Sequence, residues 1–189
     1  MKKVVLIIAL AITTFMSVNG QEVLNKGDKM FNLGLGLASR YGFIPSVVFS
    51  GEVGAIPTGD VGIVTFGGEA EYKLEVWSIS NYWYSDAGIK NHLAAGFRAA
   101  WHLHVFNNPK YDLYAGLSGG FRMVSRNSNW IEWSYEKGYY TDYSNYYGGY
   151  QTVFVGARIM TSDNFGFFGE VASGWNSMSY LRVGMTFKM

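Results

Sequence analysis

Apolar and polar residues alternate in eight separate stretches of this chain, and this alternation constrains the fold more than any other feature of the sequence. The last ten residues, YLRVGMTFKM, show it without a break. A period of two is typical of a β-strand whose two faces meet different environments. The eight stretches cover residues 30–38, 46–55, 63–76, 92–106, 113–124, 151–161, 165–175 and 180–189. Turn-like residues separate several of them, so we predict an all-β fold of eight antiparallel, up-and-down strands.

The first twenty residues have the composition of a secretory signal peptide. Lys2 and Lys3 precede an apolar run, and Val18-Asn19-Gly20 offers a cleavage site before Gln21. The alternative, a membrane anchor, fits less well because the apolar run is too short to span a bilayer comfortably. We therefore predict a signal peptide at 1–20 and one mature domain at 21–189.

The composition is unusual for an exported soluble domain. Charged residues make up 15% of the chain and aromatic residues 17%, whereas an ordinary soluble domain carries about 25% charged residues. Beyond the leader no apolar run reaches the length of a membrane-spanning helix, so we expect none. A closed β-barrel in an outer membrane is a solution for such a chain, because it pairs every strand edge.

Several kinds of chemistry are excluded or unsupported. The chain has no Cys, so it forms no disulfide, thiolate nucleophile or cysteine-ligated metal site. The mature domain has a net charge of −1, since removal of Lys2 and Lys3 takes two from the +1 of the whole chain. Without a basic stripe we predict no nucleic-acid partner. His102 and His104 share a strand face, but two ligands define no metal site, and we predict no cofactor.

Nearly every charge within the predicted strands lies on one face. A soluble, lipocalin-like binder would carry many Lys and Glu on its outer face, whereas this polar face is mostly small residues with isolated charges of both signs. Such a set suits the narrow lumen of an eight-stranded barrel, which side chains just fill. The predicted lumen network comprises Glu69, Glu71, Arg98, Arg122, Arg158, Glu170 and Arg182. The apolar face is then expected to contact lipid, with Phe31, Phe165 and Phe187 near one rim and Trp175 near the other.

Residues 29–189 resemble the small eight-stranded outer-membrane barrels of the OmpA/OmpX type, and the short start at 26–29 is similar to barrels of Bacteroidetes-like outer-membrane families. The segment 180–189 resembles the strand that outer-membrane assembly machinery recognises, although it ends in Met189 with Phe187 two residues earlier. The resemblance implies a multi-pass transmembrane β-barrel in the outer membrane, with periplasmic termini. It also implies contact with membrane lipid, lipopolysaccharide and the assembly machinery.

A long segment at 125–150 is rich in aromatic residues among Ser, Asn and Gly. We predict an extracellular loop here that binds a protein or a glycan, because rigid aromatics with adaptable polar neighbours make good contact surfaces. The alternative is a hairpin that extends two strands beyond the membrane and pairs its aromatics across the strands. The candidate contact residues are Trp130, Trp133, Tyr135, Tyr139, Tyr140, Tyr143, Tyr146 and Tyr147.

A structural or surface-interaction role is therefore expected, with other functions kept as alternatives. A narrow pore is disfavoured because eight strands leave little room in the lumen. A lipid-modifying enzyme would need a site such as His92 with Ser85 and Asp86, but this spacing matches no hydrolase motif, and we predict no catalytic residue. A secreted lipocalin-like binder is the remaining alternative.

Overall fold

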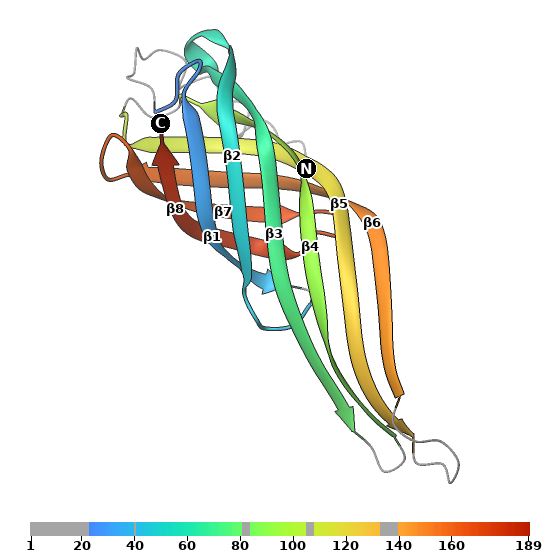
Figure 1. The fold of residues 1–189 in the computed structure, drawn as a ribbon. Coiled ribbons are helices and arrows are strands. Elements are labelled where there is room, and N and C mark those ends of the chain that lie inside the picture. The colour runs from blue at the N-terminus through green and yellow to red at the C-terminus, as the bar shows by residue number, and fades with distance from the viewer. Residues whose placement is uncertain (1–22, 40, 81–83, 105–107, 133–139) are drawn as a thin grey trace, which may run out of the picture.

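Eight antiparallel strands close into one barrel (Figure 1), which confirms the predicted eight-stranded up-and-down topology. The computed structural model describes residues 23–39, 41–80, 84–104, 108–132 and 140–189, so the predicted signal peptide at 1–20 lies outside the described residues. The strands are β1 Lys29–Ser39, β2 Ser46–Pro57, β3 Gly62–Ser80, β4 Tyr84–Leu103, β5 Tyr111–Glu132, β6 Tyr140–Met160, β7 Phe165–Ser173 and β8 Ser179–Lys188. A 3₁₀ turn, η1 Gly59–Val61, joins β2 to β3. Each strand pairs with its neighbour in sequence, and β1 pairs with β8 to close the ring.

The four central strands are about twice as long as the others. Strands β3 to β6 have 19, 20, 22 and 21 residues, whereas the remaining strands have between 9 and 12. The pairing of β2 with β3 stops at Tyr72, and the pairing of β7 with β6 stops at Val153. Beyond these points the long strands leave the ring as a four-stranded projecting sheet, residues 73–80, 84–92, 124–132 and 140–150 (Figure 1).

The strand boundaries correct two predictions from the sequence. The segment 77–91, between the predicted strands at 63–76 and 92–106, was expected to be a loop, but β3 and β4 pair from Val76 as far as Ser80 and Ser85. The loop expected at 125–150 is also mostly strand, since β5 and β6 pair from Val124 opposite Tyr146 to Trp130 opposite Tyr140. The apolar alternation ends because neither face of the projecting sheet meets a continuous core. The Tyr, Trp and Thr residues there are nonetheless good strand formers.

The barrel has two ends, and each has its own connections. The turns β2–β3, β4–β5 and β6–β7 lie at the end that holds the first and last strand residues, where the Lys29 amide donates to the Met189 carbonyl at 3.0 Å. We call this end the base. The opposite end, from which the sheet projects, is the mouth. No helix among the described residues is long and apolar enough to cross a membrane.

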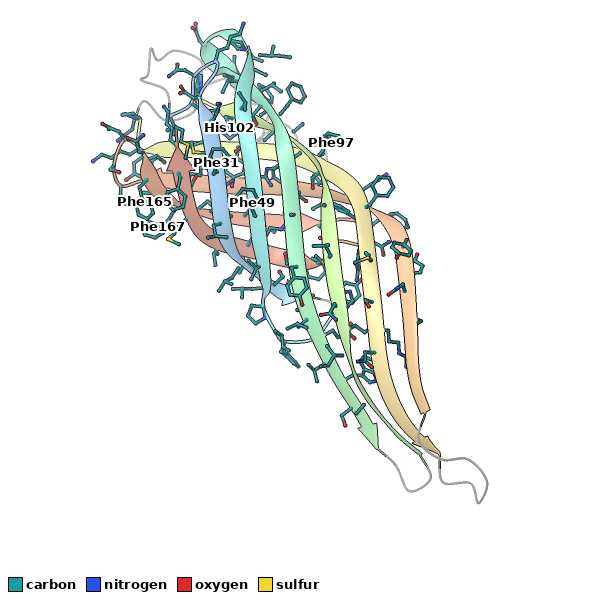
Figure 2. All side chains as sticks on the ribbon, in the orientation of Figure 1. Phe31, Phe49, Phe97, His102, Phe165 and Phe167 are labelled. Atoms are coloured by element: carbon teal, nitrogen blue, oxygen red, sulfur yellow. The ribbon has the colours of Figure 1, made fainter. Side chains whose placement is uncertain are left out.

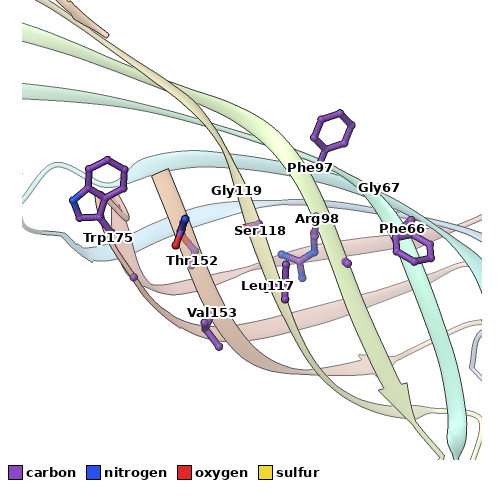
Figure 3. A pocket seen from close by; sticks show the side chains of 13 residues that line it. Phe66, Gly67, Phe97, Arg98, Leu117, Ser118, Gly119, Thr152, Val153 and Trp175 are labelled. Atoms are coloured by element: carbon purple, nitrogen blue, oxygen red, sulfur yellow. The ribbon is translucent and has the colours of Figure 1, made fainter. Parts of the chain in front are cut away.

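The two faces of the wall differ as the alternation predicts. Phe97 and Arg98 are neighbours in sequence, and Figure 3 shows them on opposite sides of β4. The Phe97 side chain is 84% exposed on the outside, whereas Arg98 is 3% exposed inside the barrel. The same alternation holds along β1, where Leu33 and Leu35 are exposed and Asn32 is buried. The prediction that the apolar face points outward is therefore confirmed.

Phenylalanines gather on the outside near the base (Figure 2). The ring centroid of Phe165 lies 5.3 Å from that of Phe167 and 5.4 Å from that of Phe187. Phe31 stacks on Phe49 of the adjacent strand with centroids 6.4 Å apart. An aromatic belt at one rim of an apolar wall is typical of barrels that sit in a bilayer.

Close backbone contact occurs where β4 and β5 pass from the wall toward the projecting sheet. Gly96 and Gly120 are directly opposite each other in the register. A Cβ atom on Gly120 would lie 2.4 Å from the Gly96 Cα and 2.3 Å from the Ala95 carbonyl oxygen. Only glycine allows this approach without moving the backbone.

Candidate functional site

The lumen near the base contains a group of ion pairs that we call the base layer: Glu52, His102, Asp112 and Arg158. Arg158 donates to Glu52 and, at 3.0 Å, to Asp112. The His102 Nδ1 atom lies 2.8 Å from the Asp112 carboxylate, and Thr65 donates its hydroxyl to Glu52 at 2.9 Å. These groups come from strands β2 to β6, so the base layer joins five strands through the interior.

A second group, the central layer, lies between the base layer and the mouth and comprises Glu69, Glu71, Arg98, Glu170 and Arg182. Arg98 donates to Glu170 at 2.6 Å and to Glu69 at 3.4 Å. Arg182 donates to Glu69 at 3.2 Å, to Glu170 at 3.1 Å and to Glu71 at 3.0 Å. Hydroxyl groups donate to the same carboxylates from Ser46, Ser118, Tyr114 and Tyr150.

Aromatic rings fill the space between the two layers. Tyr114 is fully buried, and its ring lies 4.5 Å from the Arg158 guanidinium and 5.1 Å from the His102 ring. Phe154 lies 3.7 Å from the Arg98 guanidinium. The lumen is therefore packed with side chains along both layers, as the interior of an eight-stranded barrel requires.

The mouth contains a third group, the mouth cluster: Tyr41, Glu75, His92 and Arg122. Arg122 donates to the Tyr41 hydroxyl at 2.7 Å and lies 2.6 Å from His92 Nδ1. His92 Nε2 lies 2.8 Å from Glu75. Arg122 also donates to the Asn176 carbonyl at 3.3 Å. Through Arg122, the segments that follow β1 and β7 are fastened to the inner face of the long strands.

The contacts of His92 define its protonation. A guanidinium has donors only, so the Nδ1 atom facing Arg122 must accept, and the proton of the neutral ring is on Nε2, facing Glu75. Glu75 and His92 lie beyond the closed wall, in the projecting sheet. Burial, together with the charge of Arg122, holds the pKa of His92 below its ordinary value even though Glu75 acts in the opposite direction. The pKa of Glu75 is also lowered, because hydrogen bonds from His92 and Lys90 outweigh the effect of burial.

The seven residues predicted to line the lumen are all buried inside the barrel. Six of them form ion pairs in the central or base layer. Arg122 differs, because it lies at the mouth and, within the described part of the chain, contacts a phenol, a carbonyl and an imidazole but no carboxylate.

Sequence reasoning missed other members of these layers. Asp112 lies just before the predicted strand at 113–124 and was not included in it, yet it faces inward and pairs with Arg158. Its position two residues before Tyr114, on the same face, was the available signal. The sequence placed Glu52 and His102 on the polar face of their strands. It could not identify their partners, which lie on other strands and come close only when the ring closes.

The aromatic residues of the predicted 125–150 loop are distributed over the hairpin. Tyr146 is 60% exposed and Tyr147 is 68% exposed, on opposite faces of β6. Tyr150 is buried and donates to Glu69 at 3.3 Å. Trp130, Tyr140 and Tyr143 have strand positions, but their side chains lie outside the described set. Trp133, Tyr135 and Tyr139 lie outside the described residues altogether.

The arrangement also bears on the enzyme and metal alternatives. Ser85 and Asp86 precede His92 on the same strand, and six residues of strand separate Asp86 from His92 by roughly 20 Å. His92 contacts Glu75 and Arg122 instead. In the part of the chain that the structure describes, no group of three or more His, Asp or Glu side chains is arranged to hold a metal ion.

The outer wall contains a groove of about 590 Å³ beside the mouth (Figure 3). Phe66, Phe97, Leu117, Val153 and Trp175 line it. These apolar side chains point outward, and the inward-facing residues Arg98, Ser118 and Thr152 also contribute to the lining.

No protein-family model matches the chain, and no curated protein matches it. Among solved structures, the chain is similar to two crystal structures of Ail, the attachment invasion locus protein of Yersinia pestis. One has 8% sequence identity and a TM-score of 0.44. The other, a complex with the heparin analogue sucrose octasulfate, has 9% identity and a TM-score of 0.45. Each comparison covers 87% of this chain and 100% of that chain. At these values the similarity carries no argument about residues or ligands.

Proposed function

We propose that this chain is an integral barrel of an outer membrane, with both termini on the periplasmic side, and that its projecting sheet is a surface for interactions outside the cell. The observation that carries the proposal is the contrast between the two faces of the wall. Large apolar side chains are exposed on all eight strands, whereas most of the described charged side chains of the wall are buried inside. Soluble proteins avoid so large an exposed apolar surface, and a bilayer requires it.

The packed lumen supports a role other than transport. The two ion-pair layers cross the barrel at successive heights, and Tyr114 and Phe154 fill the space between them. Wide aqueous channels are formed by barrels with about twice as many strands. A non-enzymatic role agrees with the contacts of His92, which join it to a carboxylate and a guanidinium without a nucleophile.

The projecting sheet supports the interaction role. Beyond the ring, β3 and β6 are edge strands, because β2 and β7 end where the projection begins. Tyr146 and Tyr147 expose aromatic surface on both faces of β6. A sheet with exposed tyrosines above the membrane has the properties of a contact surface for an extracellular protein or glycan.

The membrane location is tested by refolding the mature chain in detergent and comparing boiled with unboiled samples on a denaturing gel. A closed barrel resists detergent until it is heated, so the two samples should migrate differently. A chain that stays soluble without detergent and migrates identically in both lanes would contradict the proposal. The interaction role is tested with a variant in which short turns replace residues 75–90 and 125–146. This variant should still migrate differently before and after boiling, but cells that express it should no longer adhere to a surface carrying the extracellular protein or glycan. Unchanged adhesion of these cells would refute the role of the sheet.

A further inference from the structure

We propose that residues 23–28, which we call the plug, close the lumen at the base, with Leu24 as the side chain inserted between the strands. This inference deepens the proposed function and rests on it for the assignment of the base to the periplasmic side. The plug would keep periplasmic water away from the ion pairs of the base layer.

Leu24 is buried inside the base although it precedes the first strand. Its side chain is 1% exposed and clusters with those of Met30, Ile63 and Met160. These three residues are buried at the base ends of β1, β3 and β6. A leucine from outside the ring therefore completes an apolar layer inside it.

This apolar layer lies between the base layer and the periplasm. On β3, Ile63 is two residues closer to the base than Thr65, and both face inward. On β6, Met160 is two residues closer to the base than Arg158, again on the inward face. Thr65 and Arg158 both donate to Glu52 of the base layer. An apolar layer in this position excludes water from the ion pairs, and charges attract each other more strongly where water is excluded.

A tight turn directs Leu24 back toward the ring. The Asp28 amide donates to the Asn25 carbonyl at 3.1 Å, and the Asn25 amide donates to the Asp28 carboxylate at 2.8 Å. Gly27, at the third position of this turn, has a φ of 92°, which glycine adopts readily and other residues rarely do. The sequence at 25–28 therefore encodes the reversal of the chain.

The plug is fastened to the strands on either side of β1. Lys188 of β8 donates to the Val23 carbonyl at 2.7 Å and pairs with the Asp28 carboxylate at 2.9 Å. On the other side, the Gly27 amide donates to the Gly54 carbonyl of β2 at 2.8 Å, and the Gly54 amide donates to the Asp28 carbonyl at 3.0 Å. The blue turn before β1 lies beside the C-terminus in Figure 1. Because Lys188 is placed by the pairing of β8 with β1, these contacts form only on a closed ring.

Gly54 provides the space in which the plug crosses β2. A Cβ atom at this position would lie 2.2 Å from the Asn25 carbonyl oxygen and 2.9 Å from the Ile63 side chain. The register of β2 against β3 also shifts between Gly54 and Ile56, and such an irregularity bends a strand locally. The wall is therefore shaped to accept the plug at one particular place.

The test measures how fast a water-soluble reagent reaches each end of the lumen. The chain has no Cys, so one introduced thiol reports on one position. Thr186 of β8 faces the lumen two residues inward of Lys188, and Thr152 faces it at the mouth end of β6. Both are buried, and neither hydroxyl has a hydrogen-bond partner among the described residues. Thr186→Cys and Thr152→Cys therefore lose no such bond.

Each refolded mature barrel in detergent must first migrate differently before and after boiling. It is then treated with a charged methanethiosulfonate reagent, and mass spectrometry follows the rate of labelling. We expect slow labelling of Thr186→Cys in the otherwise unaltered chain. Adding Leu24→Asn should raise this rate about tenfold or more, because a polar side chain is costly in the apolar layer and the plug opens more often. Lys26→Asn introduces the same side chain at an exposed position of the plug and should leave the rate unchanged.

A second variant displaces the plug without altering it. Gly54→Ala should also raise the labelling rate of Thr186→Cys, since its Cβ would meet the Asn25 backbone. Gly169→Ala is the matched control, because a Cβ there meets nothing within 4 Å. Neither variant should change the labelling rate of Thr152→Cys at the mouth.

Three results would overturn the plug while the different migration still supported the barrel. They are rapid labelling of Thr186→Cys in the otherwise unaltered chain, an unchanged slow rate with both Leu24→Asn and Gly54→Ala, and a rate that rises equally at Thr152→Cys. The last result would show a general loosening of the wall. An otherwise unaltered chain that migrates identically before and after boiling would instead contradict the membrane proposal.

Discussion

Arg98 of β4 and Glu170 of β7 are joined across the lumen by two hydrogen bonds, of 2.6 and 3.3 Å, although 72 residues separate them in the chain. Both side chains are almost completely buried. Glu170 also accepts from Arg182 of β8. It accepts a further hydrogen bond from Tyr114 of β5. This carboxylate therefore links four strands through the interior, in addition to the hydrogen bonds of the wall.

Replacing Glu170 with Leu should lower the free energy of unfolding by about 3–5 kcal/mol, because breaking a buried ion pair leaves its partners uncompensated. Arg158→Leu should act similarly, since it leaves Glu52 and Asp112 without their shared cation. Urea unfolding in detergent, followed by tryptophan fluorescence, measures the effect. Asp163→Asn, in the exposed β6–β7 turn, is the matched control. Unfolding of Glu170→Leu at the same urea concentration as the unaltered chain would show that the central layer contributes no net stability.

A charge on the outer wall should be costly only where the wall meets lipid. Leu117 is 63% exposed on the wall, and Tyr147 is 68% exposed on the outward side of the projecting sheet. Leu117→Arg is expected to cost about 2–4 kcal/mol in lipid vesicles, as arginine does near the middle of a bilayer. Tyr147→Arg should change stability by less than about 0.5 kcal/mol. Equal effects of the two substitutions on unfolding from vesicles would argue against a membrane around the wall.

Gly120 should tolerate no side chain, because its added Cβ would meet backbone atoms of β4 and not a flexible side chain. Gly120→Ala is expected to lower stability by about 1–3 kcal/mol, the usual cost of overpacking. Gly169→Ala provides the control, since a Cβ there meets nothing within 4 Å. Urea midpoints of the two variants should differ clearly. A neutral Gly120→Ala would mean that β4 and β5 separate easily at this point.

The mouth cluster should weaken as the pH falls. The pKa of His92 is lower in the folded protein than its ordinary value of 6.5, so the unfolded chain takes up the proton first. Stabilisation from this group is therefore complete above pH 6.5 and is lost as the pH falls through the folded-state pKa. Once charged, the ring presents an N–H to Arg122, and the contact that holds Arg122 against β4 is broken.

An NMR titration of the His92 ring in detergent micelles measures this pKa, with His92→Gln used to assign the signal. Glu75→Gln should lower the pKa further, because it removes the carboxylate that favours the charged ring. A midpoint at or above 6.5 in the unaltered chain would contradict the assigned contacts.

The sequence was sufficient to predict the wall but not the partners inside it. The alternation at 180–189 identifies the face that carries Leu181 and Val183, and the composition of the opposite face identifies the lumen. The pairing of Arg182 with Glu69 and Glu71 depends on the register and shear of a closed ring, and local sequence does not encode either. The projecting sheet was mistaken for loops because residues such as those at 77–80 are held by cross-strand pairing, without a buried face to impose a pattern.

Strands β3 to β6 follow one another in the chain, so a single uninterrupted stretch contributes the whole projecting sheet. Closure of the ring depends instead on the first and last strands, whose register runs from Met30 opposite Lys188 to Ser39 opposite Ser179. Lengthening or exchanging the two central hairpins leaves that register unchanged. The projecting sheet can therefore vary in length and sequence as one unit, while the wall remains under the separate constraint of forming a ring.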